Sequence, residues 1–350
     1  MSEPLRFGII GAGNIAGAYA QAFTDAEGAV LAAVADNRPE AARALGGRFG
    51  CPAFPSHAAL VAGCPVDAVV VCTPPALHAE ISSFFLRLGI HVLCEKPLST
   101  DLSSAWAMAA EAYRSGALLT MASKFRCVED VAQARRLVAS GAIGEIVQAE
   151  NCFTGRIDMA SRWNSVPAVS GGGVLIDNGT HSVDLLRLFL GPLADVQVVE
   201  GPRLQGLAVE ESVRLFVRNR TGALGCVELS WSLAAERESY LTLSGTHGAI
   251  EIGWRRSRWR PAGAQGWTPF GKGYDKIEAF RRQIENFARA IRGEEMLLVT
   301  IEDAIASVEV IEAAYRALHG SRWTPLGGAP APLPFRQPQP VLDLVAGARR

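Results

Sequence analysis

The chain has 350 residues, of which 49% are hydrophobic and 20% are charged, a composition typical of a globular protein with room for two domains. Its formal net charge of -1 provides no field that would attract nucleic acid or an anionic membrane. No apolar run has the length of a transmembrane helix, and no secretion signal precedes the first apolar strand. We therefore expect a cytoplasmic protein that binds neither nucleic acid nor membranes.

The cysteines indicate a reducing compartment. There are seven of them, an odd number, and no Cys-x-x-Cys pair occurs. Several lie inside apolar runs, where cysteine behaves as a small hydrophobic residue. We expect free thiols rather than disulfides, and no metal site.

The N-terminus carries a glycine-rich turn between a predicted strand at residues 5–10 and a predicted helix at residues 15–23. The turn has the pattern G-x-G-x-x-A. Gly11 permits the tight turn, Gly13 lets the backbone approach a pyrophosphate, and Ala16 is small enough for close packing of helix on strand. The pyrophosphate would lie on free N–H groups at the start of the helix. This pattern predicts a dinucleotide site.

An acidic residue at the end of the next strand supports this prediction. Asp36 follows the apolar run at residues 29–35, at the distance where a carboxylate binds the adenosine ribose. A carboxylate there would repel the 2′-phosphate of NADP, although Arg38 would soften that preference. We predict NAD, with NADP not excluded. The predicted cofactor-binding residues are Gly11, Gly13, Asn14, Ile15, Asp36, Asn37, Arg38, Cys72, Thr73, Pro74, His78, Glu95 and Lys96.

Strands and helices alternate up to residue 123, which predicts a doubly wound parallel sheet, that is, a Rossmann domain at residues 1–123. Ligands of such sheets bind beyond the carboxyl ends of the strands, where Thr73-Pro74 and Glu95-Lys96-Pro97 lie. His78 is interpreted as a surface histidine of a helix, outside the chemistry. The remaining predicted strands are residues 68–72, 90–94 and 118–122, and the remaining helices are residues 39–49, 76–88 and 102–114.

The pattern changes after residue 123. Residues 124–326 are predicted to form an α+β domain with a large, mainly antiparallel open sheet, followed by a Pro-rich tail at residues 327–350. One face of such a sheet commonly pairs with another subunit, so we expect a homodimer or homotetramer. The predicted strands are residues 145–153, 195–200, 212–219, 223–231, 240–244 and 249–252, and the predicted helices are residues 127–140, 276–292 and 301–318, with another within 171–191.

Two acid–base candidates lie on the helix predicted within residues 171–191. Asp177 and His181 are four residues apart and therefore share one helix face. A carboxylate one turn from an imidazole can orient the ring as a general base requires. The alternative is an acid at the positive end of the helix dipole and a buried structural histidine.

Lys96 is the third candidate. It leaves an apolar strand on the ligand side of the sheet and could donate to a substrate oxygen; alternatively, it is a surface lysine at a strand end. The stretch WRRSRWR at residues 254–260 is too short and isolated for nucleic acid, but it leaves open a phosphate-bearing small substrate. The suspected substrate contacts are Lys124, Arg156, Arg162, Trp163, Asn164, Asp177, His181 and Tyr274.

Four stretches together resemble the glucose-fructose oxidoreductase / inositol dehydrogenase (Gfo/Idh/MocA) family of nicotinamide-dependent oxidoreductases. They are GIIGAGNIA at residues 8–16, VCTPPALHAE at 71–80, EKPLS at 95–99 and GGGVLIDNGTHSVDLL at 171–186. The resemblance covers about the first 320 residues. It implies a Rossmann domain, a C-terminal domain with a large sheet that forms dimers or tetramers, and a catalytic group of Lys96, Asp177 and His181.

Two stretches depart from the family pattern. Lys124 stands near a position where many relatives carry a neutral residue, and RWN at residues 162–164 does not match the tryptophan-arginine order of many members. Both stretches are expected to contact substrate. The substrate is therefore expected to differ from those of the familiar inositol and glucose enzymes.

These features together predict an oxidoreductase that transfers hydride between a secondary alcohol and NAD. The alcohol would belong to a cyclic polyol, a sugar or a nucleotide sugar, with His181 as base, Asp177 orienting it and Lys96 bound to the reacting oxygen. Two alternatives remain: an NAD-dependent glycosidase that recycles its cofactor, and a non-catalytic NAD(H)-binding sensor.

Overall fold

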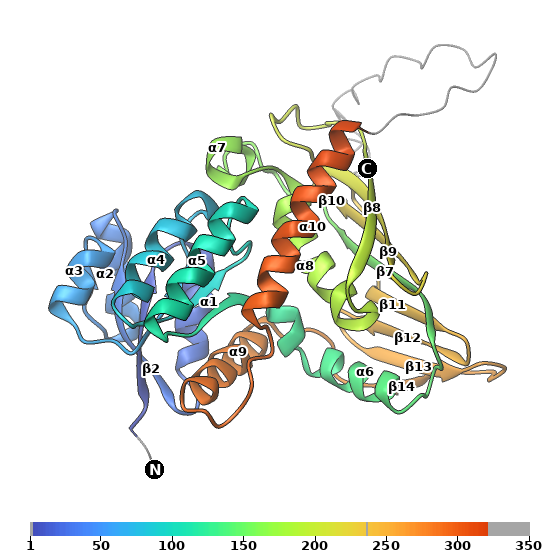
Figure 1. Ribbon diagram of the computed structural model, residues 1–350, viewed down its shortest axis with the longest axis horizontal. Coiled ribbons are helices and arrows are strands. Elements are labelled where there is room, and N and C mark those ends of the chain that lie inside the picture. Colours follow the sequence, from blue (N-terminus) through green and yellow to red (C-terminus); the bar gives the residue numbers. More distant parts are fainter. Residues whose placement is uncertain (1–2, 236, 321–350) are drawn as a thin grey trace, which may run out of the picture.

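The computed structural model describes residues 3–235 and 237–320. In that part of the chain the strands form two sheets, one parallel with six strands and one mainly antiparallel with eight, which lie side by side with helices between them (Figure 1). The predicted fold class is confirmed: a Rossmann-type α/β unit followed by an α+β unit. The predicted Pro-rich tail lies outside the described residues.

The parallel sheet has the strand order of a dinucleotide-binding fold, β3-β2-β1-β4-β5-β6. Its strands are nearly all apolar because helices cover both faces, as parallel sheets require. The strands are β1 (Leu5–Ile10), β2 (Ala29–Ala35), β3 (Ala53–Phe54), β4 (Ala68–Val71), β5 (His91–Glu95) and β6 (Leu119–Ala122). The helices that follow them are α1 (Asn14–Phe23), α2 (Pro39–Phe49), α3 (His57–Gly63), α4 (His78–Arg87) and α5 (Leu102–Ser115).

The last two helices return to this sheet. Phe280, Ile284 and Phe287 of α9 (Lys276–Ile291) join the core that α1 forms on one face. Ile305 and Val308, near the start of α10 (Ile301–Gly320), join the core on the other face. The rest of α10 runs along the second sheet, so one helix contributes to both cores (Figure 1).

The second sheet has the order β14-β13-β12-β11-β7-β10-β9-β8. Only β7 and β10, in its middle, pair in parallel. The alternation predicted for residues 212–219 is present, since Val213, Leu215 and Val217 are buried between exposed neighbours. The strands are β7 (Ile146–Thr154), β8 (Leu193–Glu200), β9 (Ser212–Asn219), β10 (Leu224–Ser230), β11 (Ser239–Gly245), β12 (Gly248–Gly253), β13 (Ser257–Pro261) and β14 (Thr268–Phe270).

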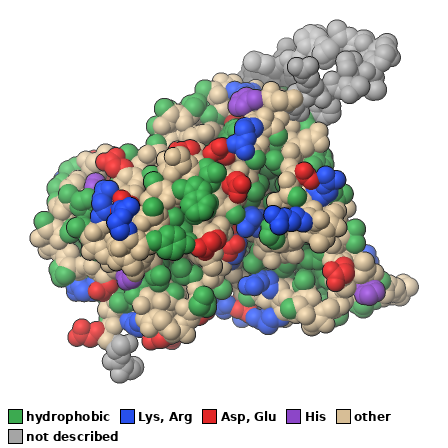
Figure 2. Space-filling view, viewed as in Figure 1, with side chains coloured by type: hydrophobic (Ala, Val, Ile, Leu, Met, Phe, Trp, Pro, Cys, Tyr) green, Lys and Arg blue, Asp and Glu red, His purple; other side chains and the backbone are tan. Residues whose placement is uncertain are grey.

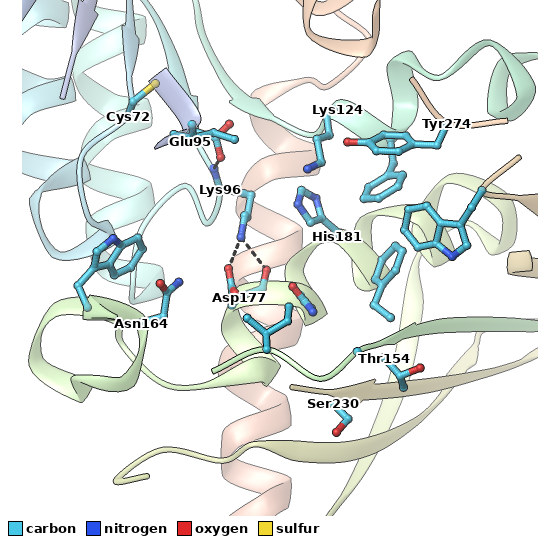
Figure 3. Close-up of a pocket in the computed structure, with 18 of the residues that line it drawn as sticks. Cys72, Glu95, Lys96, Lys124, Thr154, Asn164, Asp177, His181, Ser230 and Tyr274 are labelled. Carbon is cyan, nitrogen blue, oxygen red and sulfur yellow. Dashed lines mark hydrogen bonds and ion pairs between the residues drawn. The ribbon is translucent and has the colours of Figure 1, made fainter. Parts of the chain in front are cut away.

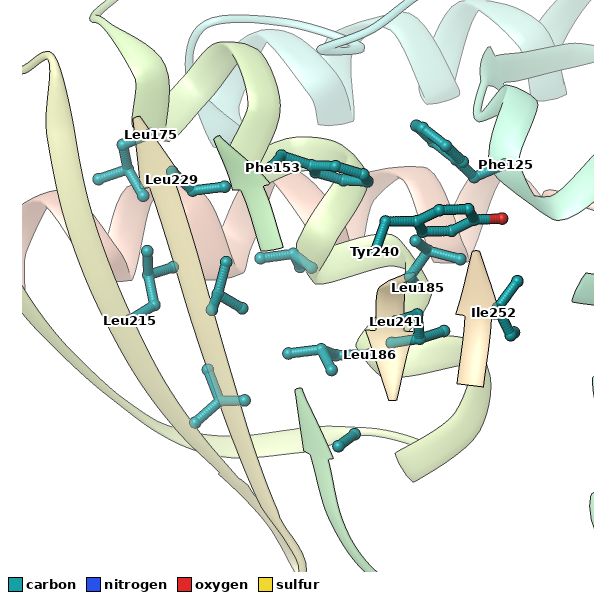
Figure 4. Packing of buried hydrophobic residues seen from close by; sticks show 14 of the residues in the cluster. Phe125, Phe153, Leu175, Leu185, Leu186, Leu215, Leu229, Tyr240, Leu241 and Ile252 are labelled. Carbon is teal, nitrogen blue, oxygen red and sulfur yellow. The ribbon is translucent and has the colours of Figure 1, made fainter. Parts of the chain in front are cut away.

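Helix α8 (Val174–Leu190) packs on the inner face of this sheet. Leu185 and Leu186 of the helix share one core with Leu215, Leu229 and other apolar side chains of the strands, and Figure 4 shows Leu185 close to Tyr240 and Leu241. Because the helix is enclosed by the sheet on one side and by α10 on another, its residues are buried nearly all round. This packing fixes the position of the helix that carries the two predicted acid–base residues.

The structure differs from the predictions mainly in short elements. The helix predicted at residues 127–140 begins at Glu129 as α6 (Glu129–Ala139), after a separate 3-10 turn at Lys124–Cys127. Elements β3, α3, β13, β14 and α7 (Pro167–Ser170) were not predicted. Strands β3 and β14 and helix α7 are too short for a periodic pattern, and β13 lies in the arginine- and tryptophan-rich stretch.

The surface has mixed charge on the face seen in Figure 2, where acidic and basic side chains are interspersed. This agrees with a net charge of -1. None of the described helices combines the length and the apolarity that a membrane crossing requires.

A buried ion-pair cluster joins three elements beside the cores. The guanidinium of Arg126, in the 3-10 turn, donates to Asp184 of α8 at 2.9 Å and to Asp303 of α10 at 2.7 Å. The Arg126 side chain is 6% exposed and that of Asp184 is fully buried. The cluster therefore links the turn that follows β6 to both long helices.

We expect Arg126→Met to lower the free energy of unfolding by about 3–5 kcal/mol, because it leaves Asp184 as a buried charge without its partner. Urea denaturation measures this. The matched control is Arg136→Met, whose side chain is 63% exposed and pairs with Glu129. The control should change the free energy of unfolding by less than about 1 kcal/mol. Equal effects of the two substitutions would contradict a stabilising role of the cluster.

Candidate active site

A cavity of about 360 Å³ lies where the carboxyl ends of β4 and β5 face α8 and the second sheet (Figure 3). Its walls come from both sheets and from the turns between them. The residues that line it are Ile15, Cys72, Thr73, Glu95, Lys96, Lys124, Phe125, Phe153, Thr154, Gly155, Ile157, Trp163, Asn164, Asp177, Asn178, His181, Ser230, Trp254 and Tyr274.

The glycine-rich turn has the geometry of a phosphate cradle. Gly11 has a φ of +95°, and a Cβ there would lie 2.8 Å from the carbonyl oxygen of Cys72. Gly13 is the N-cap residue of α1 and has no side chain that could bind the first N–H groups of the helix. The space beside it is open. The first N–H groups of the helix, at and after Asn14, are therefore free to bind an anion.

Asp36 lies at the end of β2 next to this turn. Its carboxylate accepts hydrogen bonds from the backbone N–H groups of Ala12 at 2.6 Å and Arg38 at 2.8 Å. Although burial opposes ionisation, these hydrogen bonds and the Arg38 guanidinium hold the pKa of Asp36 below its ordinary value. Asn37 and Arg38 are exposed beside it. An open cradle with an ionised acid at its side fits the pyrophosphate and adenosine ribose of NAD, and the chain's own residues that would hold them are Gly13, Asn14 and Asp36.

His78 corrects the prediction of a surface histidine. Its ring is fully buried and does not line the cavity. One ring nitrogen lies 2.7 Å from the carbonyl oxygen of Pro97 and the other 2.8 Å from that of Thr73. Burial lowers the pKa of this histidine. His78, at the start of α4, therefore joins the turn after β4 to the turn after β5.

Lys96 and Asp177 meet across the cavity. Lys96 follows the last residue of β5 and precedes a cis peptide bond to Pro97. Its ammonium donates to the backbone carbonyl of Asp177 at 3.0 Å and forms an ion pair with the Asp177 carboxylate (Figure 3). Asp177 lies in the first turn of α8. The structure thus brings together two of the three predicted catalytic residues from opposite sides of the cavity.

The segment at Glu210 passes close to the start of α8 and fixes its position. A Cβ on Gly173 would lie 2.1 Å from the carbonyl oxygen of Glu210, so only glycine fits there. The Glu210 carboxylate accepts hydrogen bonds from the N–H groups of Gly173 at 2.9 Å and Leu175 at 3.1 Å. A side chain from another segment therefore caps the helix and sets the position of Asp177.

His181 lies one turn further along α8, and here the prediction was wrong in one respect. Asp177 pairs with Lys96 and does not orient the imidazole, whose Nδ1 is buried without a hydrogen-bond partner in the described part of the chain. The ring packs edge-on against Phe125, with centroids 5.1 Å apart. The pKa of His181 lies well below its ordinary value because of burial first, and then because of the ammonium groups of Lys96 and Lys124.

Two further titratable side chains line the cavity. Lys124 points into it (Figure 3), and burial lowers the pKa of this lysine to about 8. Glu95 lies at the end of β5 and accepts a hydrogen bond from the Tyr19 hydroxyl at 2.8 Å. Burial raises the pKa of Glu95.

The suspected substrate contacts separate into two groups. Trp163, Asn164 and Tyr274 line the cavity together with Lys124 and the acid–base residues. Arg156 and Arg162 are exposed and do not line it, although their neighbours Ile157 and Trp163 do. Those two predictions are not supported by the structure.

The sequence did not reveal an aromatic wall. Phe125, Phe153, Trp254 and Tyr274 line the cavity and pack against one another, with centroid separations from 4.9 to 6.3 Å. They come from segments far apart in the chain, so no local motif marks them. Thr154 and Ser230 were missed for the same reason, whereas Asn178 was missed although it follows Asp177 in a stretch that the sequence analysis singled out. In the described residues, no group of three or more His, Cys, Asp or Glu side chains is placed to hold a metal ion.

Comparison with known proteins identifies the family. Residues 5–123 match the model described as "Oxidoreductase family, NAD-binding Rossmann fold", and residues 131–251 match that of the "GFO/IDH/MocA C-terminal domain". The chain belongs to the Gfo/Idh/MocA family of NAD-binding oxidoreductases. The resemblance seen in the sequence is thereby confirmed, as are the assignment as an NAD(P)-dependent oxidoreductase and the cofactor NAD.

The similarity to individual members of the Gfo/Idh/MocA family covers most of the chain. Inositol 2-dehydrogenase of Rhizobium meliloti is 27% identical, over 91% of this chain and 98% of its own length. A D-xylose 1-dehydrogenase (NADP(+)) of Haloferax volcanii is 28% identical, over 89% of this chain and 97% of its own. A levoglucosan dehydrogenase structure with NADH and levoglucosan has the same fold, with a TM-score of 0.84 at 22% identity, covering 91% of this chain and 98% of that one.

We expect Asp36→Ser to raise the KM for NAD⁺ about tenfold and to weaken the preference for NAD⁺ over NADP⁺, because a charged acceptor for the ribose hydroxyls is lost. Initial rates with each cofactor measure this. Asp25→Ser, at an exposed site after α1, is the matched control. An unchanged KM for NAD⁺ in Asp36→Ser would contradict the assignment.

The burial of His181 predicts how stability depends on pH. Its pKa is lower in the folded protein than in the unfolded chain, so the unfolded chain binds a proton first as the pH falls below 6.5. The stability that the neutral His181 contributes is therefore fully present above that pH and is lost as the pH falls below it. We expect the thermal midpoint to fall less between pH 8 and pH 5.5 in His181→Gln than in the wild type. The exposed His319→Gln is the control, and equal losses in all three proteins would refute this explanation.

Proposed function

We propose that this enzyme oxidises a secondary hydroxyl group of a cyclic polyol, a sugar or a nucleotide sugar, and that the reverse reduction uses the same groups. The observation that carries the proposal is the cavity that holds Lys96, Asp177 and His181 at the carboxyl ends of the Rossmann strands. In such sheets the bound dinucleotide lies at these strand ends. NAD bound there would supply the acceptor for the hydride of the carbinol carbon.

In this proposal Lys96 acts on the reacting oxygen. Its Nζ donates a hydrogen bond to the substrate hydroxyl and stabilises the negative charge that develops there. The ion pair with Asp177 holds the ammonium group at one place in the cavity. Asp177 therefore positions Lys96, whereas the sequence suggested that it orients His181.

His181 accepts the proton. Its low pKa keeps the imidazole uncharged at neutral pH, so it is ready to accept, and the ammonium groups on either side oppose its protonation before substrate binds. As hydride leaves the carbon, the hydroxyl proton becomes strongly acidic. Even a weak base can then take it.

The remaining walls fit a small hydroxylated ring. A volume of about 360 Å³ lies at the lower end of the range of roughly 300–1,000 Å³ found for small-molecule pockets. Phe153, Trp254 and Tyr274 offer an apolar surface to one face of the ring, while Asn164 and Asn178 offer hydrogen bonds to its hydroxyls. The names of the relatives, which include an inositol and a xylose dehydrogenase, support the same substrate class.

We propose a homodimer or homotetramer formed through the outer face of the large sheet. Val147, Phe216 and Leu224 are 55%, 45% and 53% exposed on strands β7, β9 and β10. Charged side chains alternate with them, including the pair of Arg214 and Glu228 at 2.9 Å. An apolar face with paired charges is suited to a second copy of itself.

All seven cysteines are free, which supports a cytoplasmic location.

Activity measurements test the proposed reaction. The protein is mixed with NAD⁺ or NADP⁺ and a panel of inositols, sugars and nucleotide sugars, and reduced-nicotinamide absorbance is followed. Appearance of reduced cofactor with one substrate supports the proposal. Release of a sugar from a glycoside without net reduction would instead indicate the glycosidase, and binding of cofactor without any turnover would indicate the sensor.

We expect Lys96→Met and His181→Asn each to lower kcat/KM at least about 100-fold, since each removes a group that acts in the transition state. Asp177→Asn should lower it less, because the amide can still accept a hydrogen bond from Lys96. Lys272→Met, at an exposed loop position, is the matched control and should stay within about threefold. Turnover within threefold in both Lys96→Met and His181→Asn would refute the assignments.

A further inference from the structure

Lys124 is a basic group in the cavity whose ammonium has no hydrogen-bond or ion-pair partner in the described residues. It comes from the turn after β6, and its ammonium lies 5.5 to 5.7 Å from the ring centroids of Phe125, Tyr274 and Phe280. Among the described residues it has neither a hydrogen bond nor an ion pair, although it is partly buried. The rings interact with the cation but accept no conventional hydrogen bond, so the N–H groups of Lys124 are available to an acceptor that enters the cavity.

The acids nearby are already engaged. The Asp177 carboxylate pairs with Lys96. Glu95 accepts hydrogen bonds from the Tyr19 hydroxyl and from the backbone N–H of Lys96, and burial raises its pKa and so favours its neutral form. The other charged or titratable groups that face Lys124 are Lys276, Tyr274 and His181. The charges of Glu95 and Asp177 still attract the Lys124 ammonium, but in the described residues neither carboxylate forms a hydrogen bond or an ion pair with it.

A second unpartnered polar group points to the same place. The hydroxyl of Tyr274 is buried without a hydrogen-bond partner in the described residues. Figure 3 shows this hydroxyl, the Lys124 ammonium and the His181 ring directed toward one another. An oxygen acceptor that fills this space would therefore bind both donors at once.

A groove next to the cavity is rich in arginine. It shares Thr154 and Trp254 with the cavity and is lined by Arg237, Arg255 and Arg256. Arg237 pairs with Glu228 and Arg256 with Glu238, and Arg255 has no ion pair in the described residues. Positive charge beside a cleft raises the rate at which anions enter it. It would give no advantage to a neutral sugar.

We propose that the substrate is a hydroxylated carboxylate, such as a uronate or an aldonate, whose carboxylate binds Lys124 and Tyr274 while its reacting hydroxyl lies at Lys96 and His181. This inference rests on the proposed function and narrows its substrate class. A carboxylate forms charge-assisted hydrogen bonds that are roughly twice as strong as those of a neutral hydroxyl, and it neutralises the enclosed ammonium.

Matched pairs of substrates test the inference. Glucose is compared with glucuronate and galactose with galacturonate, at saturating NAD⁺, in the wild type and in Lys124→Met, Lys124→Arg and Lys272→Met. We expect the acid of a pair to have a kcat/KM at least about tenfold higher in the wild type, in keeping with one charge-assisted hydrogen bond. Lys124→Met should remove that preference mainly through KM, Lys124→Arg should keep part of it, and the exposed Lys272→Met should leave it unchanged.

The same lysine predicts the pH dependence of binding. Its pKa is about 8, and only the protonated form attracts a carboxylate. The KM for the acid should therefore rise as the pH increases above about 8 in the wild type, and this rise should be absent in Lys124→Arg, whose guanidinium stays protonated.

Two results would overturn the inference. One is an equal or higher kcat/KM for the neutral member of each pair. The other is a preference for sugar phosphates that is lost in Arg255→Gln and Arg256→Gln but kept in Lys124→Met. Calorimetric titration of glucuronate into the NADH-loaded protein separates this question from the proposed reaction. Binding lost in Lys124→Met supports the carboxylate site even if no panel member is oxidised, and no binding at all refutes it.

Discussion

The ion pair between Lys96 and Asp177 is the interaction on which the rest of the cavity depends. Lys96 ends a strand of the parallel sheet, and Asp177 begins the helix that packs on the second sheet. Their contact therefore links the two sheets at the cavity. Glu210 caps the N-terminal end of the same helix, and Arg126 binds it further along, at Asp184. The position of Lys96 is thus a property of the whole molecule and not of its own strand.

Burial then decides which groups in the cavity are charged. Asp177 has a cation to pair with, whereas burial raises the pKa of Glu95 and favours its neutral form. Burial and the two neighbouring ammonium groups keep His181 neutral. Lys124 has no hydrogen bond or ion pair in the described residues, so its N–H groups are available to a substrate. A substrate that supplies an acceptor would bind them, and this is the physical basis for selecting one sugar derivative over another.

Particular residues show how far the sequence could be read. The turn at Gly11 and Gly13 and the acid at Asp36 were found because their spacing along the chain is itself the signal. His78 was misjudged because a histidine in a helix gives no sign of the loop that covers it. The partner of Asp177 was misjudged because helix spacing shows which residues share a face, but not which cation approaches from another strand. Of the aromatic wall, only Tyr274 was among the suspected substrate contacts, because the other rings carry no local signal.

Local spacing along the chain is enough to predict the Rossmann unit, the antiparallel sheet beyond it, the dinucleotide turn and the three candidate acid–base residues. The periods of helix and strand and the demands of a tight glycine turn act over a few residues. Three features required the folded molecule: α9 and α10 return to the first sheet, Asp177 pairs with Lys96, and Lys124 lies beside Tyr274 without a hydrogen bond or ion pair in the described residues. Those features depend on contacts between distant segments. The charge states of the cavity residues depend on burial, which only packing creates.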